Sequence, residues 1–215
     1  MGAPSTQTPP PSAPPLGQVL GLEGSKQFLV QHQWFSEGRN YRVLNHEKRH
    51  LFTIVENAGQ ELWANLFHSQ QPPKMGFSVQ FGASPHTFIW AIDGPNRTRL
   101  GLIQIQIHGM SVVASVVDTS GTPVVSIHIK KGMMGGLDAT AAYPDGRPMF
   151  EAKGNLLRHS FQMHDPSGGV IAKIHEAFVT TRDTYNLDVV GNVDPLYPLL
   201  LAIMIDREKE MNKQG

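Results

Sequence analysis

The stretch LYPLLLAIMI, at residues 196–205, decides the fold of this chain. A helix of about ten residues is roughly 15 Å long, whereas the hydrocarbon core of a bilayer is about 30 Å thick and needs about 20 apolar residues. The stretch is therefore too short to span a membrane. A helix that is apolar on all sides must instead be surrounded by protein. Because the upstream sequence has the pattern of β-strands, we predict a sheet that wraps around this helix.

The flanks of the apolar stretch predict where the helix begins and ends. Asp194 is a favourable N-cap residue, and Pro195 suits the first helical position. Pro198 removes an early backbone donor, so in an alternative interpretation the regular helix begins there. The sequence DREKE follows at residues 206–210, and its charges lie three apart, which suits solvated last turns. We predict a central helix at about residues 195–211.

The sequence before the helix alternates apolar and polar residues in short runs. LIQIQIH at residues 102–108 and VSIHIK at residues 125–130 place aliphatic side chains on one face and mostly polar ones on the other. A period of two predicts half-buried strands of an antiparallel sheet. Turn signals at intervals of about ten to twenty residues predict a chain of hairpins. These signals lie at residues 57–59, 93–96, 118–121, 144–146 and 165–169.

We therefore predict an all-β fold with one C-terminal helix, in which a closed antiparallel barrel of about twelve strands surrounds a central buried hydrophobic helix. One hairpin can be given a register. Pairing Asp165 with Val170 sets Met163 opposite Ala172, so that apolar residues face each other. A slip by one residue would mix the two faces.

The composition limits the classes of function. The formal net charge is zero and the pI is about 7.2, whereas a protein that binds nucleic acid by bulk electrostatics is usually basic. We therefore expect no nucleic acid among its partners. The chain has no Cys, which excludes a disulfide framework, a thiolate metal site and a cysteine nucleophile. A basic and apolar segment typical of a signal peptide is not apparent.

The first 25 residues differ in composition from the rest, because prolines are frequent there among Ser, Thr, Gln and Gly. Such a segment cannot bury enough apolar area to offset its conformational entropy. We predict a flexible, Pro-rich arm at residues 1–25 and a single barrel domain at residues 26–212.

Several segments resemble a known family. RDTY at residues 182–185, a short strand, an acidic turn and the aliphatic helix resemble the C-terminal part of LURP-one-related proteins. The opening also fits this family, with FLV at 28–30, YRVL at 41–44 and FTIVEN at 52–57. LURP-one-related proteins belong with the phospholipid scramblases and the tubby C-terminal domain in one structural superfamily. The resemblance covers about residues 26–211 and implies a tubby-like barrel threaded by a C-terminal helix.

The resemblance implies lipid binding but does not assign its residues. Tubby domains hold phosphoinositide headgroups with clustered Lys and Arg, and no motif here matches those positions. Scramblases carry a cysteine cluster and an acidic calcium segment, whereas this chain has no Cys and lacks the acidic spacing. Phospholipid scrambling is thus implied by the resemblance alone.

Three basic pairs are the candidate residues for binding a lipid headgroup. Each lies at a predicted strand end or turn, where binding residues are frequent. Two pairs on one rim would form an anion site that donates charge-assisted hydrogen bonds to a phosphate. In the alternative interpretation these loops carry only solvated charge. The pairs are Lys48 with Arg49, Arg97 with Arg99, and Lys130 with Lys131.

Carboxylates before the helix are candidate calcium ligands. Asp183, Asp188 and Asp194 supply oxygen atoms of the kind that calcium prefers. An EF-hand spacing is absent, and Asp also favours turns and helix caps for local reasons. We expect no other cofactor.

The histidines do not predict a catalytic site. The densest group is His159, His164 and His175, with Glu176 nearby. The hairpin register places His164 on the face opposite to His159, so these ligands do not converge on one metal. The chain also lacks a G-x-S-x-G nucleophile elbow and a glycine loop for phosphates. We therefore predict no enzymatic activity.

Three functions compete, and the missing motifs argue against one of them, a small hydrolase that uses His and Asp. The first is a non-enzymatic, scramblase-like or LURP-one-like barrel that binds membrane phospholipid or phosphoinositide headgroups at its rim. It implies a cytoplasmic protein that lies peripherally at the inner face of the plasma membrane. The alternative is a soluble scaffold or adaptor that recruits a protein partner through the Pro-rich arm or the barrel surface. A rim with clustered Lys and Arg favours the first, and scattered charge beside an exposed apolar patch favours the second.

Overall fold

The computed structural model describes residues 16–20, 22, 25–33, 40–56, 87–108, 111–131, 136–155, 160–176 and 184–213. Some sequence predictions lie outside these residues, among them the turn at 57–59, the carboxylate of Asp183 and most of the Pro-rich arm. No helix in the described part of the chain is long and apolar enough to cross a membrane.

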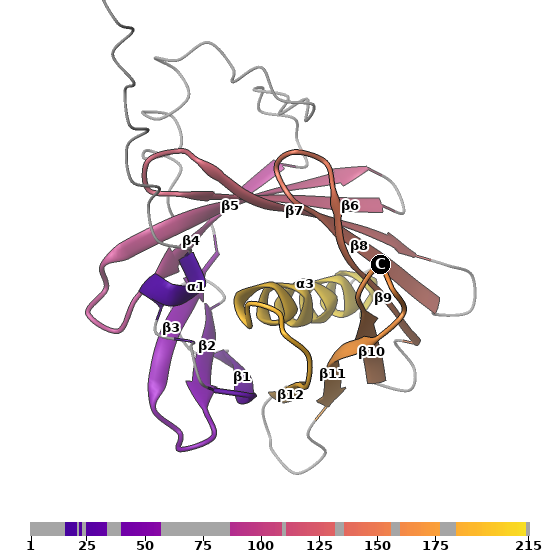
Figure 1. Cartoon of the computed structure of the whole chain (residues 1–215). Helices are drawn as coiled ribbons and strands as arrows, with labels where there is room; N and C mark the ends of the chain where they lie inside the picture. Colours follow the sequence, from indigo (N-terminus) through magenta and orange to yellow (C-terminus); the bar gives the residue numbers. More distant parts are fainter. Residues whose placement is uncertain are drawn as a thin grey trace, which may run out of the picture.

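Strands make up most of the described chain (Figure 1). They are β1 (Gln27–Gln33), β2 (Asn40–Asn45), β3 (His50–Val55), β4 (Thr87–Asp93), β5 (Arg99–His108), β6 (Ser111–Asp118), β7 (Pro123–Lys131), β8 (Gly136–Ala142), β9 (Pro148–Asn155), β10 (Ser160–His164), β11 (Val170–Glu176) and β12 (Thr184–Val189). The helices are α1 (Leu16–Val19) and α3 (Leu196–Lys213).

The strands form one closed antiparallel barrel. Each strand pairs with its neighbours in the chain, and β1 pairs with β12, so that the first and last strands close the wall. We call this pairing of β1 with β12 the seam. In Figure 1, α3 lies within the ring of strands. The predicted fold class, an antiparallel barrel around a C-terminal helix, is confirmed.

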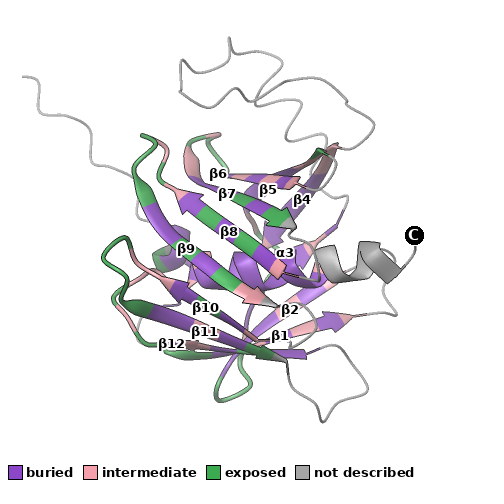
Figure 2. Ribbon diagram, turned by 90° about the vertical axis from the view of Figure 1, so that its right-hand side faces the viewer, coloured by how far each residue is buried: buried purple, intermediate pink, exposed green. Residues whose placement is uncertain are grey.

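The strand directions give the barrel two different ends. At one end, tight turns join β2 to β3, β4 to β5, β6 to β7, β8 to β9, and β10 to β11, and residues 190–195 lead from β12 into α3. We call it the hairpin end. The opposite end, where α3 approaches its C-terminus, is the exit end (Figure 2).

The core of the protein is the space between α3 and the inner face of the wall. Every residue from Leu199 to Ile205 is at most 4 % exposed, which explains why this stretch is apolar all round. The inward residues of the strands alternate as predicted, and Ile103 and Ile105 of β5 belong to the same buried cluster as the helix. The burial pattern is visible in Figure 2 as purple segments on the helix and along the strands.

The helix begins close to the predicted residue. The backbone N–H of Leu196 donates to Asp194 Oδ1 at 2.9 Å, so Asp194 is the N-cap. Pro198 lies in the first turn of α3, where a missing backbone donor breaks no intrahelical bond. The polar end differs from the prediction, because Asp206 is not solvated but only 1 % exposed.

The N-terminal boundary of the core also differs from the expected limit of the arm at residue 25. Leu16, Leu20 and Leu22 are buried in the core cluster, and α1 packs against the hairpin end. A Cβ on Gly17 would lie 2.0 Å from Asp194 Oδ1, so only glycine allows α1 to approach the cap of α3 this closely. Three leucines within seven residues supply apolar area that the Pro-rich part lacks.

The predicted register of the β10–β11 hairpin is confirmed for residues 161–163 of β10. Met163 pairs with Ala172, and Gln162 pairs with Lys173 on the other face. The register shifts by one residue after Met163, so that His164 rather than Asp165 pairs with Val170. The cause is an extra residue on β11, because Val170 and Ala172 pair with successive residues of β10 and Ile171 forms a β-bulge between them.

A charge in the middle of α3 should prevent folding. We expect Leu201→Asp or Ile203→Asp to lower the free energy of unfolding by about 4 kcal/mol or more, because an unpaired carboxylate would enter an apolar core. Thermal melting followed by circular dichroism measures this. The exposed turn variant Thr119→Asp is the control and should melt as the wild type does. Wild-type melting of either core variant would contradict the enclosed helix.

Candidate functional site

The tight turns of the hairpin end share one backbone geometry. In the β6–β7 turn, Gly121 N–H donates to Asp118 C=O at 3.1 Å, and Asp118 N–H donates to Thr122 C=O at 3.0 Å. The other turns repeat this pair of bonds at the same spacing. They comprise residues 45–49, 94–98, 143–147 and 165–169. Each is a three-residue loop, so the five turns are structurally equivalent.

The fourth position of every such turn has a left-handed backbone. Glycine occupies it in three turns, at Gly121, Gly146 and Gly168, with φ of 83°, 84° and 90°. Lys48 and Arg97 occupy it in the β2–β3 and β4–β5 turns, with φ of 62° and 60°. A residue with a Cβ is strained in this conformation by about 1 kcal/mol or more. Two basic side chains are therefore kept where the fold favours glycine.

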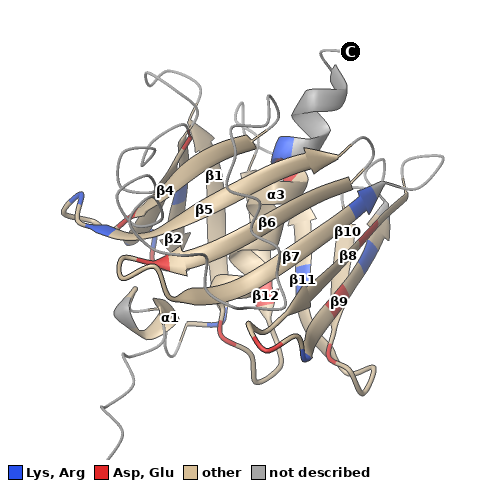
Figure 3. Ribbon diagram, turned by 90° about the horizontal axis from the view of Figure 1, so that it is seen from above, with Lys and Arg blue, Asp and Glu red and all other residues tan. Residues whose placement is uncertain are grey.

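The structure brings two of the three predicted basic pairs to the same end of the barrel. Lys48 and Arg49 lie in the β2–β3 turn, and Arg97 and Arg99 lie in or beside the β4–β5 turn. These hairpins are neighbours, because β3 pairs with β4. β7 runs away from the hairpin end, so Lys130 and its neighbour in sequence lie at the exit end. In Figure 3, blue segments mark the turn after β4 and, on the opposite side, the end of β7.

The members of these pairs differ in their partners. Arg99 Nε donates to Asp93 Oδ1 at 2.5 Å, and both side chains are partly buried, with exposures of 31 % and 15 %. Arg99 is therefore held in the hairpin by a carboxylate. Lys48, Arg49 and Arg97 are exposed, and the backbone N–H of Arg49 donates to Asn45 Oδ1 at 2.9 Å, which fixes the turn.

A histidine lies beside the first basic pair. His50 follows Arg49, and its Nε2 is 2.9 Å from Thr53 Oγ1. Burial, and then the positive charge of Arg42, lower the pKa of His50 below its ordinary value of 6.5. On β7, burial and then Lys130 likewise lower the pKa of His128 from 6.5. Both rings are thus predominantly neutral at pH 7.

The candidate calcium ligands do not form a group in the described part of the chain. Asp188 lies on β12 between Gln27 and Lys173, and Asp194 caps α3. Among the described residues, no three His, Asp or Glu side chains are placed to hold a metal ion. The histidine pair on the β10–β11 hairpin does not converge either, since His175 pairs with Ser160 and His164 with Val170.

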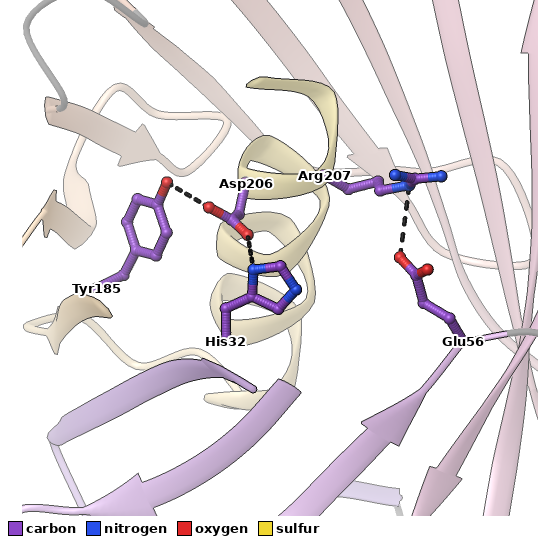
Figure 4. A network of polar contacts seen from close by, with 5 residues as sticks. All are labelled: His32, Glu56, Tyr185, Asp206 and Arg207. Carbon is purple, nitrogen blue, oxygen red and sulfur yellow. Dashed lines mark hydrogen bonds and ion pairs between the residues drawn. The ribbon is translucent and has the colours of Figure 1, made fainter. Parts of the chain in front are cut away.

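A buried polar cluster at the exit end has no local sequence signal (Figure 4). Tyr185 of β12 donates its hydroxyl to Asp206 Oδ1 at 2.7 Å. His32 of β1 places Nδ1 3.8 Å from Asp206 Oδ2. These three side chains are 1–2 % exposed. One carboxylate on α3 thus contacts both strands of the seam.

The cluster extends to a second contact of the helix. Arg207 Nε is 3.4 Å from Glu56 Oε1, just after β3. The Tyr41 ring stacks on His32 with centroids 4.9 Å apart. Burial, followed by the negative charges of Asp206 and Glu56, raises the pKa of Tyr41 well above 10.0. Because these groups are buried and engaged with one another, their role is to fix α3 within the wall.

A pocket of about 420 Å³ lies at the hairpin end, between α1, the residues before β1 and the link from β12 to α3. Leu22 and Val193 form part of its apolar wall. Lys26 and Asp194 are the only charged side chains among its described lining residues. The described lining therefore offers no pair of carboxylates or histidines for general acid–base chemistry.

The contact between Tyr185 and Asp206 should stabilise the closed barrel. We expect Tyr185→Phe to lower the free energy of unfolding by about 1–3 kcal/mol, because a buried carboxylate loses a hydrogen-bond donor. Urea unfolding followed by fluorescence measures the change. Tyr143→Phe, which removes the hydroxyl of an exposed tyrosine, is the matched control and should be nearly neutral. Equal losses in the two variants would contradict a stabilising role for this contact.

The lowered pKa values of His50 and His128 predict a loss of stability in acid. The unfolded chain takes up these protons near pH 6.5, whereas the folded protein takes them up only at lower pH. The contribution of these two histidines to the free energy of unfolding is thus fully present above pH 6.5. It falls as the pH drops towards their pKa values in the folded protein. The difference in urea midpoint between pH 7.5 and pH 5.5 should shrink in a His50→Gln/His128→Gln variant. An unchanged difference in that double variant would contradict this assignment.

Comparison with known proteins finds a family that matches part of this chain. Residues 100–206, from β5 to the buried end of α3, match the family model described as LURP-one-related. No curated protein matches the chain. Among solved structures, an X-ray structure of a protein from Arabidopsis thaliana is similar, with 13 % sequence identity and a TM-score of 0.49. The alignment covers 85 % of this chain and 91 % of the Arabidopsis chain. The predicted resemblance is confirmed over residues 100–206: this part of the chain matches the LURP-one-related family, which belongs to the tubby-like superfamily.

Proposed function

We propose that this barrel binds the headgroups of anionic phospholipids, phosphoinositides included, with the basic turns of its hairpin end. The observation that carries the proposal is the placement of Lys48 and Arg97, which occupy strained left-handed positions in neighbouring turns where the equivalent turns have glycine. Strain of this kind is characteristic of functional positions. At family level, a tubby-like barrel is of a lipid-binding type, and the LURP-one-related family is not a known enzyme family.

The chemistry of these turns suits a phosphate. Arg49 and Arg97 have planar guanidinium groups that donate two parallel hydrogen bonds to phosphate oxygens, and Lys48 adds a point charge. The backbone of each turn is fixed by paired hydrogen bonds such as Lys48 N–H to Asn45 C=O at 2.9 Å. Little backbone entropy is therefore lost on binding. Arg99 supports the β4–β5 turn through Asp93.

The third basic pair has no part in this proposal. Lys130 and Lys131 end β7 at the exit end, which faces away from a surface bound by the hairpin end. A membrane-bound barrel would lie peripherally, at the inner face of the plasma membrane where anionic lipids are concentrated. The proposal concerns headgroup binding and includes no transport of lipid across the bilayer.

The strength of such binding follows from the number of charges. Each Lys or Arg near an anionic surface contributes about 1 kcal/mol, so the three exposed residues give about 3 kcal/mol. The attraction decays over a Debye length of about 10 Å at 0.1 M salt. Binding should therefore be modest, sensitive to salt and limited to anionic vesicles.

Substitutions at the left-handed positions are expected to change lipid affinity and protein stability in different directions. In a Lys48→Gly/Arg97→Gly variant, glycine relieves the backbone strain, so the urea midpoint should be unchanged or higher. The same variant loses two charges from the proposed site, so its affinity for anionic vesicles should fall about tenfold or more. Co-sedimentation with neutral, phosphatidylserine-containing and phosphoinositide-containing vesicles at low and physiological salt measures the affinity.

The matched control is Lys130→Gln/Lys153→Gln, which makes the same change of net charge away from the hairpin end. It should bind nearly as tightly as the wild type. Equal losses in the two double variants would show that only bulk charge matters. If the wild type pellets with no vesicle, headgroup binding is wrong and a protein partner becomes the function to pursue.

A further inference from the structure

Exposed apolar side chains gather at one end of the barrel. The large hydrophobic residues that are exposed in the described part of the chain are Tyr143, Val170 and Val190, at 38 %, 37 % and 53 %. Single exposed hydrophobic residues are ordinary on protein surfaces. These three residues differ from scattered ones because they lie at the same end of the barrel, one on each of three successive chain connections.

The topology places all three at the hairpin end. Tyr143 begins the β8–β9 turn, Val170 follows the β10–β11 turn, and Val190 follows β12. These connections are successive around the ring, because β8 to β12 are successive neighbours in the wall. The basic turns with Lys48 and Arg97 lie at the same end, and the β6–β7 turn separates the β4–β5 turn from the β8–β9 turn. One rim thus has an apolar sector and a basic sector.

The apolar sector has the character of a membrane interface. The guanidinium of Arg147 lies 5.2 Å from the centre of the Tyr143 ring, which pairs an aromatic ring with a cation in the manner favoured at the headgroup level. The nearby carboxylates have hydrogen-bond partners within their own turns. Asp145 Oδ2 accepts from Arg147 Nε at 2.7 Å, and Asp165 Oδ1 accepts from the backbone N–H of Ser167 and Gly169.

We propose that the barrel docks end-on on an anionic bilayer, with Tyr143, Val170 and Val190 entering the interface while the basic turns meet the headgroups. This inference rests on the proposed function and adds the orientation of the protein and a second set of contacts. The occupant is a lipid surface, because the rim combines cations with an aromatic ring and aliphatic side chains. The seam and the axis of α3 are then roughly perpendicular to the membrane surface, and the exit end faces the aqueous phase.

The absence of cysteine makes the orientation measurable. Single-cysteine variants Tyr143→Cys, Val170→Cys and Val190→Cys each give one labelling site on an otherwise Cys-free chain. Control sites at the exit end are His108→Cys and Lys130→Cys, both exposed. Each variant is labelled with an environment-sensitive fluorophore and added to vesicles of phosphatidylcholine with phosphatidylserine or phosphoinositide. Half of the vesicles carry a nitroxide quencher near the top of the acyl chains.

On binding, labels at the hairpin end should shift to the blue, brighten several-fold and be quenched by the nitroxide, whereas labels at the exit end should not change. Co-sedimentation of the same samples reports binding separately. If the protein pellets but hairpin-end labels stay in a water-like environment, end-on insertion is wrong and headgroup binding stands. Quenching at His108 or Lys130 instead would overturn the orientation. If nothing pellets, both proposals fail.

A second variant tests the apolar contacts without a label. Val190→Asn/Val170→Asn removes apolar area from exposed positions, so its melting should match that of the wild type. Its affinity for anionic vesicles should fall several-fold at physiological salt, where the electrostatic part is screened. Unchanged affinity under these conditions would show that the apolar sector does not enter the bilayer.

Discussion

The structure depends on the burial of a helix that has no polar face. An eight-stranded barrel has an interior about wide enough to be filled by its own side chains, whereas a twelve-stranded wall leaves room for a further element. Residues 196–205 fill that room, and the wall in turn removes the helix from water. Each part thus buries apolar surface of the other. The wall is closed by the pairing of β1 with β12, and its inward residues share one buried cluster with α3.

This mutual dependence divides the molecule into two ends with different tasks. At the exit end, Asp206 contacts Tyr185 and His32 across the seam, and Arg207 contacts Glu56. These contacts fix the depth and rotation of α3. At the hairpin end, the exposed side chains of the turns lie outside the core, so they can vary without disturbing the packing of α3 against the wall. The basic and apolar sectors lie on this second end.

Local patterns in the sequence were sufficient for the wall and the helix. The alternation in β5 and β7 and the apolar run of α3 are periodic signals that depend only on neighbouring residues. The polar cluster was not predictable, because His32 and Asp206 are distant in sequence and meet only through closure of the barrel. The β2–β3 turn has no glycine signal in the sequence, since Lys48 occupies its left-handed position. Whether two basic pairs share a rim depends on strand directions, which follow only from the complete strand order.

The seam joins the two extremes of the folded chain, and this has a consequence for biosynthesis. β1 is made early, but its partner β12 and the helix that fills the barrel are made last. At about 5–20 residues per second, β1 waits on the order of ten seconds for β12 to leave the ribosome. During that time the inward faces of eleven strands have no central helix to cover them. A premature stop before α3 would release a product whose inward strand faces stay uncovered, a kind of surface that favours aggregation.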